Sequence, residues 1–139
     1  MSKPNFHTFQ KIPSFHPELP TVIAPSIGNS TSDGKVQKIL GGYEKHGHYL
    51  VGSFQINKLI GVVGLDIQGK TGIIKHIAVL PEYRLQGVGK ALIRHVIEHF
   101  SLRALHAETD EDSVGFYRKL KFTCEPFEGP YGKRYKCDY

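Results

Sequence analysis

The segment Gly72–Phe100, GIIKHIAVLPEYRLQGVGKALIRHVIEHF, decides the fold of this chain. Its first part is an apolar, β-branched run that ends at Pro81, and it predicts a buried strand because proline cannot donate to a strand ladder. From Val88 onward, apolar residues recur at helical spacing with charged residues between them, which predicts an amphipathic helix. The segment is therefore a strand, a loop and a helix in succession.

The loop Arg84–Gly89, RLQGVG, is suited to an anion. Gly87 and Gly89 have no side chain where the backbone turns into the helix, so main-chain amides there can approach a ligand closely. A helix start also carries unpaired N–H groups and a partial positive charge, and Arg84 and Lys90 add to that charge. The loop is a candidate cradle for a phosphate or pyrophosphate.

Two common phosphate-binding motifs do not match this loop. A Walker A motif needs Ser or Thr after Gly-Lys, but Ala91 follows Lys90, and the first glycine of the motif is also missing. A dinucleotide fingerprint needs a third glycine where this chain has Leu92. Both motifs are excluded.

The loop instead resembles the Arg/Gln-x-x-Gly-x-Gly/Ala signature of GNAT-type acetyltransferases, preceded by Ala78–Arg84 (AVLPEYR) as in that family. A second match lies at Thr109–Phe122, where Phe116–Lys119 (FYRK) resembles the family's later helix. The resemblance covers roughly residues 49–139. It implies an α/β (α+β) GNAT fold: a mixed, mostly antiparallel central sheet with splayed fourth and fifth strands and flanking helices.

Length and composition fit one globular domain over residues 1–139. The resemblance implies that it is a single acetyltransferase domain, in which residues 1–32 form an atypical, irregular segment. No signal peptide and no apolar run near the ~20 residues of a membrane helix is visible, which predicts a cytoplasmic protein. Cys124 and Cys137 lie outside any CxxC spacing and indicate reduced thiols, although the sequence leaves a bridge open.

The formal charge of +5 indicates an anionic partner, and a nucleotide-bearing cofactor is itself anionic. Nucleic acid is the weaker alternative, because Lys and Arg are scattered and no nucleic-acid motif is present. The sequence leaves the oligomeric state open, with a homodimer as one alternative.

Five prolines between residues 1 and 32 argue against a long helix there, and Thr21–Ala24 is a candidate short edge strand. Ser32-Asp33 predicts a cap for a short helix over residues 35–40, which Gly41-Gly42 ends. Residues 43–48 are expected to form a solvated loop. Its histidines, His46 and His48, lack a third ligand, so no metal site is predicted.

The remaining elements follow from alternation and turn residues. They are a hairpin of residues 49–56 and 59–67 around Asn57-Lys58, a strand at 102–108, a helix at 112–120, and strands at 122–125 and 134–137.

The resemblance implies three groups of contacts with acetyl-CoA. The main chain of the strand would hold the pantetheine arm, the loop would hold the pyrophosphate, and two residues farther along would lie near the cofactor. In that order they are Ile77, Ala78 and Val79; Arg84, Leu85, Gln86, Gly87, Val88, Gly89 and Lys90; and Asp110 and Tyr117. Asp110 stands where many relatives carry asparagine and, when ionised, cannot donate a hydrogen bond.

Transfer of acetyl from a thioester to an amine needs a neutral amine, a polarised carbonyl and a proton for the departing thiolate. Tyr117 stands where the family commonly places a tyrosine near the cofactor sulfur, and a phenol can donate that proton. A purely structural tyrosine is the alternative.

The base is less determined. Strand alternation places Ile73 and Lys75 on one face with Ile77, and Ile74 and His76 on the other with Ala78. Relatives with a Glu or His base on this strand use positions 73 or 75, so that carboxylate is absent here. His76 has the best intrinsic pKa for the role and is the second catalytic candidate, beside Glu82, Glu108 or an ordered water.

Lys121 replaces the glycine that the family carries before the final phenylalanine, so a turn with positive φ would be strained or locally different. Taken together, the sequence predicts an N-acetyltransferase that moves acetyl from acetyl-CoA to an unidentified primary amine of a small molecule or peptide. The alternatives are a CoA-binding module without turnover and a basic nucleic-acid-interacting protein.

Overall fold

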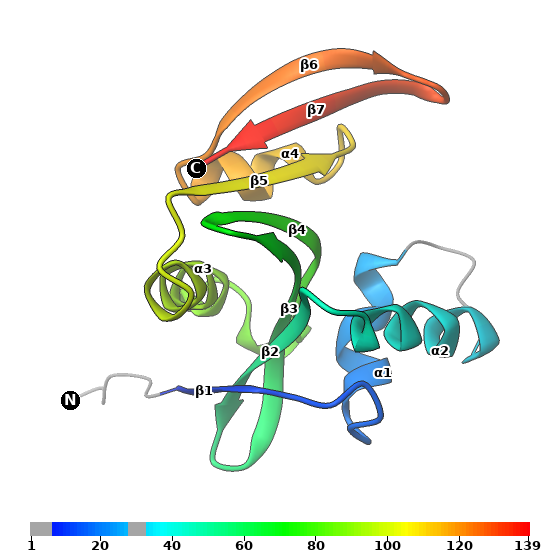
Figure 1. The fold of residues 1–139 in the computed structure, drawn as a ribbon, viewed down its shortest axis with the longest axis vertical. Coiled ribbons are helices and arrows are strands. Elements are labelled where there is room, and N and C mark those ends of the chain that lie inside the picture. Colours follow the sequence, from blue (N-terminus) through cyan, green and yellow to red (C-terminus); the bar gives the residue numbers. More distant parts are fainter. Residues whose placement is uncertain (1–6, 28–32) are drawn as a thin grey trace.

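A seven-stranded sheet runs through the computed structural model, which describes residues 7–27 and 33–139 (Figure 1). The strand order is β1-β2-β3-β4-β5-β7-β6, and only β4 and β5 pair in parallel. The elements in chain order are β1 Thr8–Lys11, α1 Leu19–Ile23, η1 Ala24–Ser26, α2 Asp33–Gly41, η2 Gly42–Glu44, β2 His48–Gln55, β3 Lys58–Gln68, β4 Thr71–Val79, η3 Pro81–Tyr83, α3 Val88–His99, β5 Ala104–Thr109, α4 Val114–Lys119, β6 Thr123–Gly129 and β7 Gly132–Asp138. This arrangement confirms the predicted fold class.

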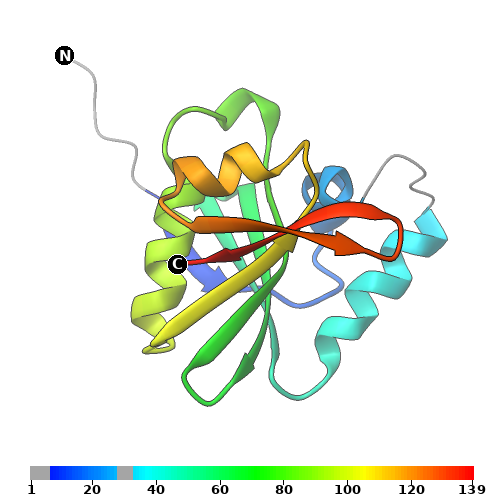
Figure 2. The same ribbon diagram turned by 90° about the horizontal axis from the view of Figure 1, so that it is seen from above.

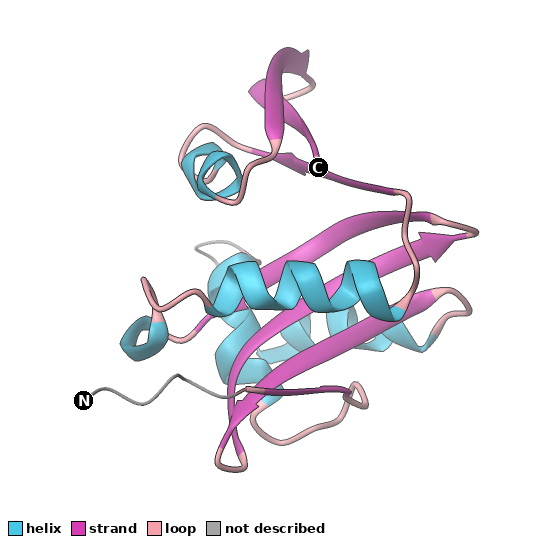
Figure 3. Cartoon of the chain, turned by 90° about the vertical axis from the view of Figure 1, so that its left-hand side faces the viewer, coloured by secondary structure: helices cyan, strands magenta, loops and turns pink. Residues whose placement is uncertain are grey.

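Helices cover both faces of the sheet (Figures 1 and 2). On one face α3 and α4 bury an apolar core that includes Leu92 and Tyr117. On the other face α1, α2 and η2 bury a second core that includes Ile23 and Leu40. Figure 3 shows α3 lying across the strands, with α1 and α2 behind them. The central strands are therefore buried on both sides, as their continuous apolar runs require.

The predicted splay between the fourth and fifth strands is present. Parallel pairing begins at Thr71 with Ala104 and ends at Ile74 with Ala107. In the described sheet, residues 76–79 of β4 pair with β3 but not with β5. The second half of β4 therefore has one edge without a strand partner in the described sheet.

The edge strand predicted at residues 21–24 was wrong, both in the structure of that stretch and in the location of the edge strand. Residues 21–24 do not form an edge strand, because α1 and η1 occupy this stretch. Pro20 is compatible with α1 because it lies in the first turn, where its missing N–H has no helical partner. The edge strand is β1, which pairs with β2 from Thr8 opposite Phe54 to Lys11 opposite Val51.

The helix predicted at 35–40 is confirmed as α2, while its proposed cap, Ser32, lies outside the described residues. The strands and helices predicted after residue 48 are confirmed with shifted ends. The β2–β3 turn is formed by Ile56 and Asn57, which both have positive φ, so β3 already begins at Lys58.

Strict alternation along β4 was also a wrong prediction, because the strand contains a bulge. Gly64 of β3 pairs with His76, but its neighbour Leu65 pairs with Ile74, which leaves Lys75 as the extra residue. Ile74 consequently joins the core under α3, while His76 faces Tyr43 on the α2 side. Ile74 and His76 lie on opposite faces of the sheet.

Lys121 has a φ of +75°, so the turn adopts the left-handed conformation that the sequence predicted to be strained for a residue other than glycine. We expect Lys121→Gly to raise the free energy of unfolding by about 0.5–1 kcal/mol, since glycine removes the cost of a left-handed backbone. Urea unfolding measures this change. Lys119→Gly, at the last residue of α4 and without a positive φ, is the matched control and should lower stability. A loss of stability in both variants would contradict the strain at Lys121.

Candidate active site

The start of α3 presents free main-chain donors. Gly87 has a φ of +82°, which brings the chain into the helix in a left-handed conformation that glycine accepts without strain. The first intrahelical bond runs from the Ala91 N–H to the Gly87 carbonyl. Within the described residues, the N–H groups of Val88, Gly89 and Lys90 have no backbone acceptor. They are the donors that the predicted anion cradle requires.

The two glycines of the loop serve different purposes. A Cβ on Gly87 would have open space within 4 Å, so glycine there serves the backbone conformation and the surface of the loop. A Cβ on Gly89 would lie 3.1 Å from the Phe116 ring, so that glycine lets α3 pack closely on α4.

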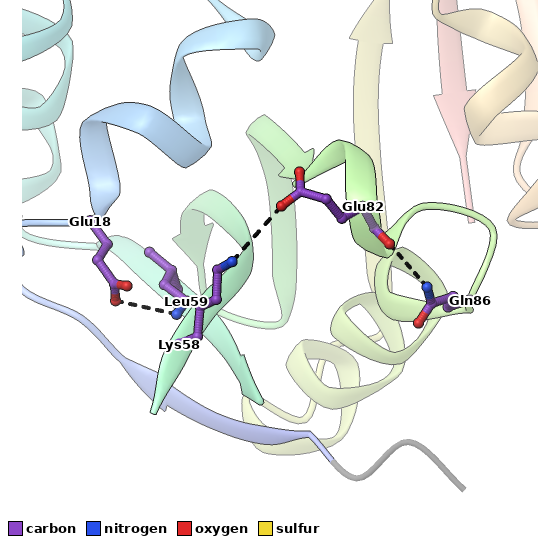
Figure 4. A network of polar contacts seen from close by, with 5 residues as sticks. All are labelled: Glu18, Lys58, Leu59, Glu82 and Gln86. Carbon is purple, nitrogen blue, oxygen red and sulfur yellow. Dashed lines mark hydrogen bonds and ion pairs between the residues drawn. The ribbon is translucent and has the colours of Figure 1, made fainter. Parts of the chain in front are cut away.

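Polar contacts hold the loop from outside (Figure 4). The Gln86 amide donates to the Glu82 carbonyl at 3.1 Å, and the Glu82 carboxylate lies 3.8 Å from the Lys58 ammonium. Arg84 Nε donates to the Val79 carbonyl at 3.1 Å, so its side chain lies back along β4. Glu82, an alternative base in the sequence, thus points toward the β2–β3 turn.

Two residues of β4 offer main-chain groups at its open edge. The Leu80 N–H donates to the Ile60 carbonyl at 2.8 Å, and antiparallel pairing alternates from there. The main-chain groups of Ala78 therefore face β3. Those of Ile77 and Val79 face away from β3, at the edge where β5 is unpaired.

Tyr117 is buried in the core on the α3 side, with its ring edge-on to Phe122 at 5.3 Å between centroids. Burial raises the pKa of Tyr117, and the nearby thiols of Cys137 and Cys124 raise it further. The side chain therefore remains a phenol at neutral pH and keeps a proton that it can donate.

The Tyr117 hydroxyl reaches solvent although its ring does not. No hydrogen bond to it is found among the described residues, and it is not one of their buried unpartnered atoms, His7 Nδ1 and Ser53 Oγ. A buried ring with an accessible, unpaired hydroxyl is the arrangement that a proton donor to a bound ligand needs.

His76 lies on the opposite face of the sheet from Tyr117. Its Nδ1 is 2.5 Å from the Tyr43 hydroxyl. Burial lowers the pKa of His76, and the charge of Lys75 lowers it further, so the imidazole is neutral at pH 7. Tyr117 and His76 therefore lie on opposite faces of the sheet.

Asp110 acts within its own turn. Its carboxylate accepts a hydrogen bond from the Ser113 N–H at 2.9 Å, and its carbonyl accepts one from the Val114 N–H at 3.1 Å. These bonds stabilise the start of α4, the helix that carries Tyr117. Glu108, the other alternative base, is exposed on β5 opposite Lys136.

A small cavity of about 160 Å³ lies beside the cradle, between α3 and the end of α4. Three of its lining side chains are cationic, which suits a phosphate group. The lining residues are Lys90, Ile93, Arg94, Leu120, Lys121 and Tyr139. Arg94 and Lys121 were not predicted as site residues, because only the fold brings them to Lys90.

Tyr43 was also missed, since it lies in a segment predicted as a solvated loop. No local signal links it to a strand residue 33 positions away. In that same segment, His48 lies 3.7 Å from Asp66. Across residues 7–27 and 33–139, no three metal-binding side chains come together.

Apolar helices long enough to cross a membrane are absent from the part of the chain that the structure describes.

Comparisons with known proteins agree with this geometry. The model of the acetyltransferase (GNAT) family matches residues 22–122. No curated protein matches the sequence.

Three solved structures share the fold. A GNAT family acetyltransferase from Elizabethkingia anophelis, with acetyl-CoA bound, has a TM-score of 0.71 and 19% identity over 98% of both chains. An aminoglycoside 6'-N-acetyltransferase in complex with coenzyme A has a TM-score of 0.76 and 12% identity over 95% of this chain and 96% of that one. The ribosomal-protein-S18-alanine N-acetyltransferase from Escherichia coli has a TM-score of 0.72 and 16% identity over 96% and 91%.

At these identities the structural similarity shows the fold alone, whereas the family match covers most of the sequence. The family match and the shared fold together show that the chain belongs to the GNAT family of acetyltransferases.

Proposed function

We propose that this protein is an N-acetyltransferase that moves acetyl from acetyl-CoA to a primary amine of a small molecule or peptide by direct attack. The observation that carries the proposal is that one segment, residues 76–90, holds both the unpaired edge of β4 and the free amides at the start of α3. Solved neighbours with acetyl-CoA or coenzyme A bound support the choice of cosubstrate.

The residues fit such a ligand. Diphosphate oxygens accept hydrogen bonds from the free N–H groups at Val88, Gly89 and Lys90, assisted by the helix dipole. The amides of a pantetheine arm add to the open edge of β4 through the main chain of Ile77 and Val79. Arg84 Nε donates to the Val79 carbonyl, so an arm that bonds to this carbonyl displaces the Arg84 side chain.

The transfer forms a C–N bond and breaks the C–S bond of the thioester. The amine loses a proton, and the departing thiolate needs one. Tyr117 supplies the proton to the sulfur from the α3 side of the open edge. His76 contacts the reacting groups from the α2 side. The amine proton passes to water, and water returns a proton to Tyr117.

The seven strands form one sheet, which supports a single domain over residues 1–139. A cytoplasmic location is part of the same proposal. Cys124 and Cys137 lie directly opposite each other on β6 and β7 as free thiols, which a reducing compartment preserves.

A CoA-binding module without turnover is the second candidate. It is favoured because the two β4 positions where relatives carry a base hold no carboxylate in this chain. They hold Ile73 and Lys75, whose side chains are exposed. Calorimetry with acetyl-CoA, followed by a panel of primary amines with detection of free thiol, separates the two candidates. Binding with thiol release supports the enzyme, binding without release for any amine supports the module, and no binding contradicts both.

The cationic cavity leads to a prediction about the cofactor's 3′-phosphate. We expect Arg94→Gln to weaken coenzyme A binding about 3- to 10-fold and to leave dephospho-CoA binding unchanged, since one exposed charge contributes modestly. Calorimetry with both ligands measures the difference. Arg103→Gln makes the same charge change near the β3–β4 turn and should alter neither affinity. Equal weakening of both ligands by Arg94→Gln would contradict a 3′-phosphate contact.

A further inference from the structure

The contact between Tyr43 and His76 joins η2 to the middle of β4. The Tyr43 hydroxyl and His76 Nδ1 are 2.5 Å apart, and the two rings meet edge-on with 5.8 Å between centroids. Tyr43 is buried in the core under α1 and α2, so its ring cannot swing into solvent without opening that core. The hydroxyl is therefore fixed against one nitrogen of the imidazole.

Gly64 provides the space for this contact. It lies on β3 directly opposite His76, and a Cβ there would be 2.0 Å from the Tyr43 hydroxyl oxygen. Gly64 does not have a positive φ, so its backbone conformation does not require glycine. The missing side chain makes room for the Tyr43 hydroxyl and for the edge of its ring.

The direction of the hydrogen bond follows from the groups available. Burial raises the pKa of Tyr43, so it is a phenol with one proton to donate. In the described chain, His76 Nδ1 is the only hydrogen-bond partner of that hydroxyl. A buried O–H left without an acceptor is costly, so Tyr43 donates and Nδ1 accepts. A neutral imidazole that accepts at Nδ1 carries its proton at Nε2.

His76 Nε2 is available to a ligand. It has no hydrogen-bond partner among the described residues, and it is not one of their buried unpartnered atoms. The nitrogen therefore reaches solvent on the α2 side of β4, where the strand has already parted from β5.

We infer that Tyr43 is a positioning residue that holds His76 as the neutral Nε2–H tautomer, so that His76 acts on the acetyl-transfer complex as a hydrogen-bond donor and not as a base. The tautomer is independent of any activity, whereas the donor role rests on the proposed function. An N–H fixed in place stabilises negative charge that develops on the carbonyl oxygen during attack, and it keeps its proton throughout. If His76 acted as a base through Nε2, that nitrogen would carry the lone pair and Nδ1 would carry the proton. Nδ1 could then not accept a hydrogen bond from Tyr43, and the hydroxyl would need another acceptor.

Nitrogen-15 NMR of the ligand-free protein tests the tautomer. We expect His76 at pH 7.5 to show a protonated Nε2 and an unprotonated Nδ1. Tyr43→Phe removes the donor, and Gly64→Ala displaces it while leaving both partners intact, so each should move the Nδ1 signal toward that of an unfixed ring. Gly41→Ala, where a Cβ meets nothing within 4 Å, should leave the signals unchanged. A protonated Nδ1 in the wild type, or signals indifferent to both Tyr43→Phe and Gly64→Ala, overturns the inference.

Acetyl transfer tests the donor role. His76→Gln keeps an N–H donor but cannot take up a proton, whereas His76→Ala loses both functions. We expect kcat to fall less than about 10-fold in the Gln variant and about 100-fold or more in the Ala variant. An equal fall in kcat in the two variants overturns the donor role. It is also overturned if the wild-type pH profile has an acidic limb that is missing in both variants, since that limb would report a base. Failure of wild-type protein to acetylate any amine counts against the proposed function and, with it, the donor role, while the NMR result still decides the tautomer.

Discussion

Replacing Gly87 with valine is expected to weaken acetyl-CoA binding on the order of 100-fold, which corresponds to about 3 kcal/mol. The side chain would stand on the surface where the diphosphate approaches the amides of α3, and charge-assisted hydrogen bonds of this kind are among the strongest in proteins. The ligand-free chain has open space around this position, so the variant should fold. Isothermal calorimetry measures the affinity directly.

The control for Gly87→Val must carry the same backbone strain. Gly69 has a φ of +61°, and a Cβ there also meets nothing within 4 Å, but it lies in the β3–β4 turn at the other end of β4. Gly69→Val should therefore destabilise the fold by a similar amount and leave acetyl-CoA affinity unchanged. If both variants bind acetyl-CoA as tightly as the wild type, the loop is not the phosphate cradle.

Tyr117→Phe should lower kcat by about 10²- to 10⁴-fold with little change in acetyl-CoA affinity, since a positioned general acid contributes that much. The variant keeps the buried ring and loses only a hydroxyl without a partner in the described chain, so stability should hardly change. Tyr135→Phe is the matched control, because Tyr135 is buried in the same core and carries no proposed role. Equal activity of wild type and Tyr117→Phe would make Tyr117 a purely structural residue.

The pH profile provides a second readout for Tyr117. Its pKa is raised, so the phenol keeps its proton above pH 10 and loses it only in more alkaline solution. The activity that depends on this proton should therefore be constant through neutral and mildly alkaline pH. A fall in kcat centred below pH 10 that disappears in Tyr117→Phe would contradict the assignment of a raised pKa.

The strand, loop and helix at residues 72–100 were predictable because their signals are local. The apolar run predicts the strand, the two glycines predict the loop and the helical repeat predicts the helix, and each pattern spans only a few residues. The open edge of β4 was not visible in that pattern. It was expected from the resemblance to a family, and the pairing of β4 with β5 confirmed it.

Elements that depend on distant partners were predicted poorly. β1 has only four residues and is defined by its pairing with β2 and not by a pattern of its own. Pro20 suggested extended structure, whereas it lies in the first turn of α1, which forms because the buried residues Leu19 and Ile23 pack on the sheet. The partnership of Tyr43 with His76 arises from three segments that meet at Gly64, and no spacing rule encodes it.

The bulge at Lys75 divides β4 into two stretches whose inward and outward sides are exchanged. Ile74, before the bulge, packs in the core under α3, whereas His76, after it, faces Tyr43 on the α2 side. Substitutions at these two positions therefore act on opposite faces of the sheet. An alignment of β4 with its homologues must allow for the extra residue Lys75. Counting every second residue across the bulge would assign a functional side chain to the wrong face of the sheet.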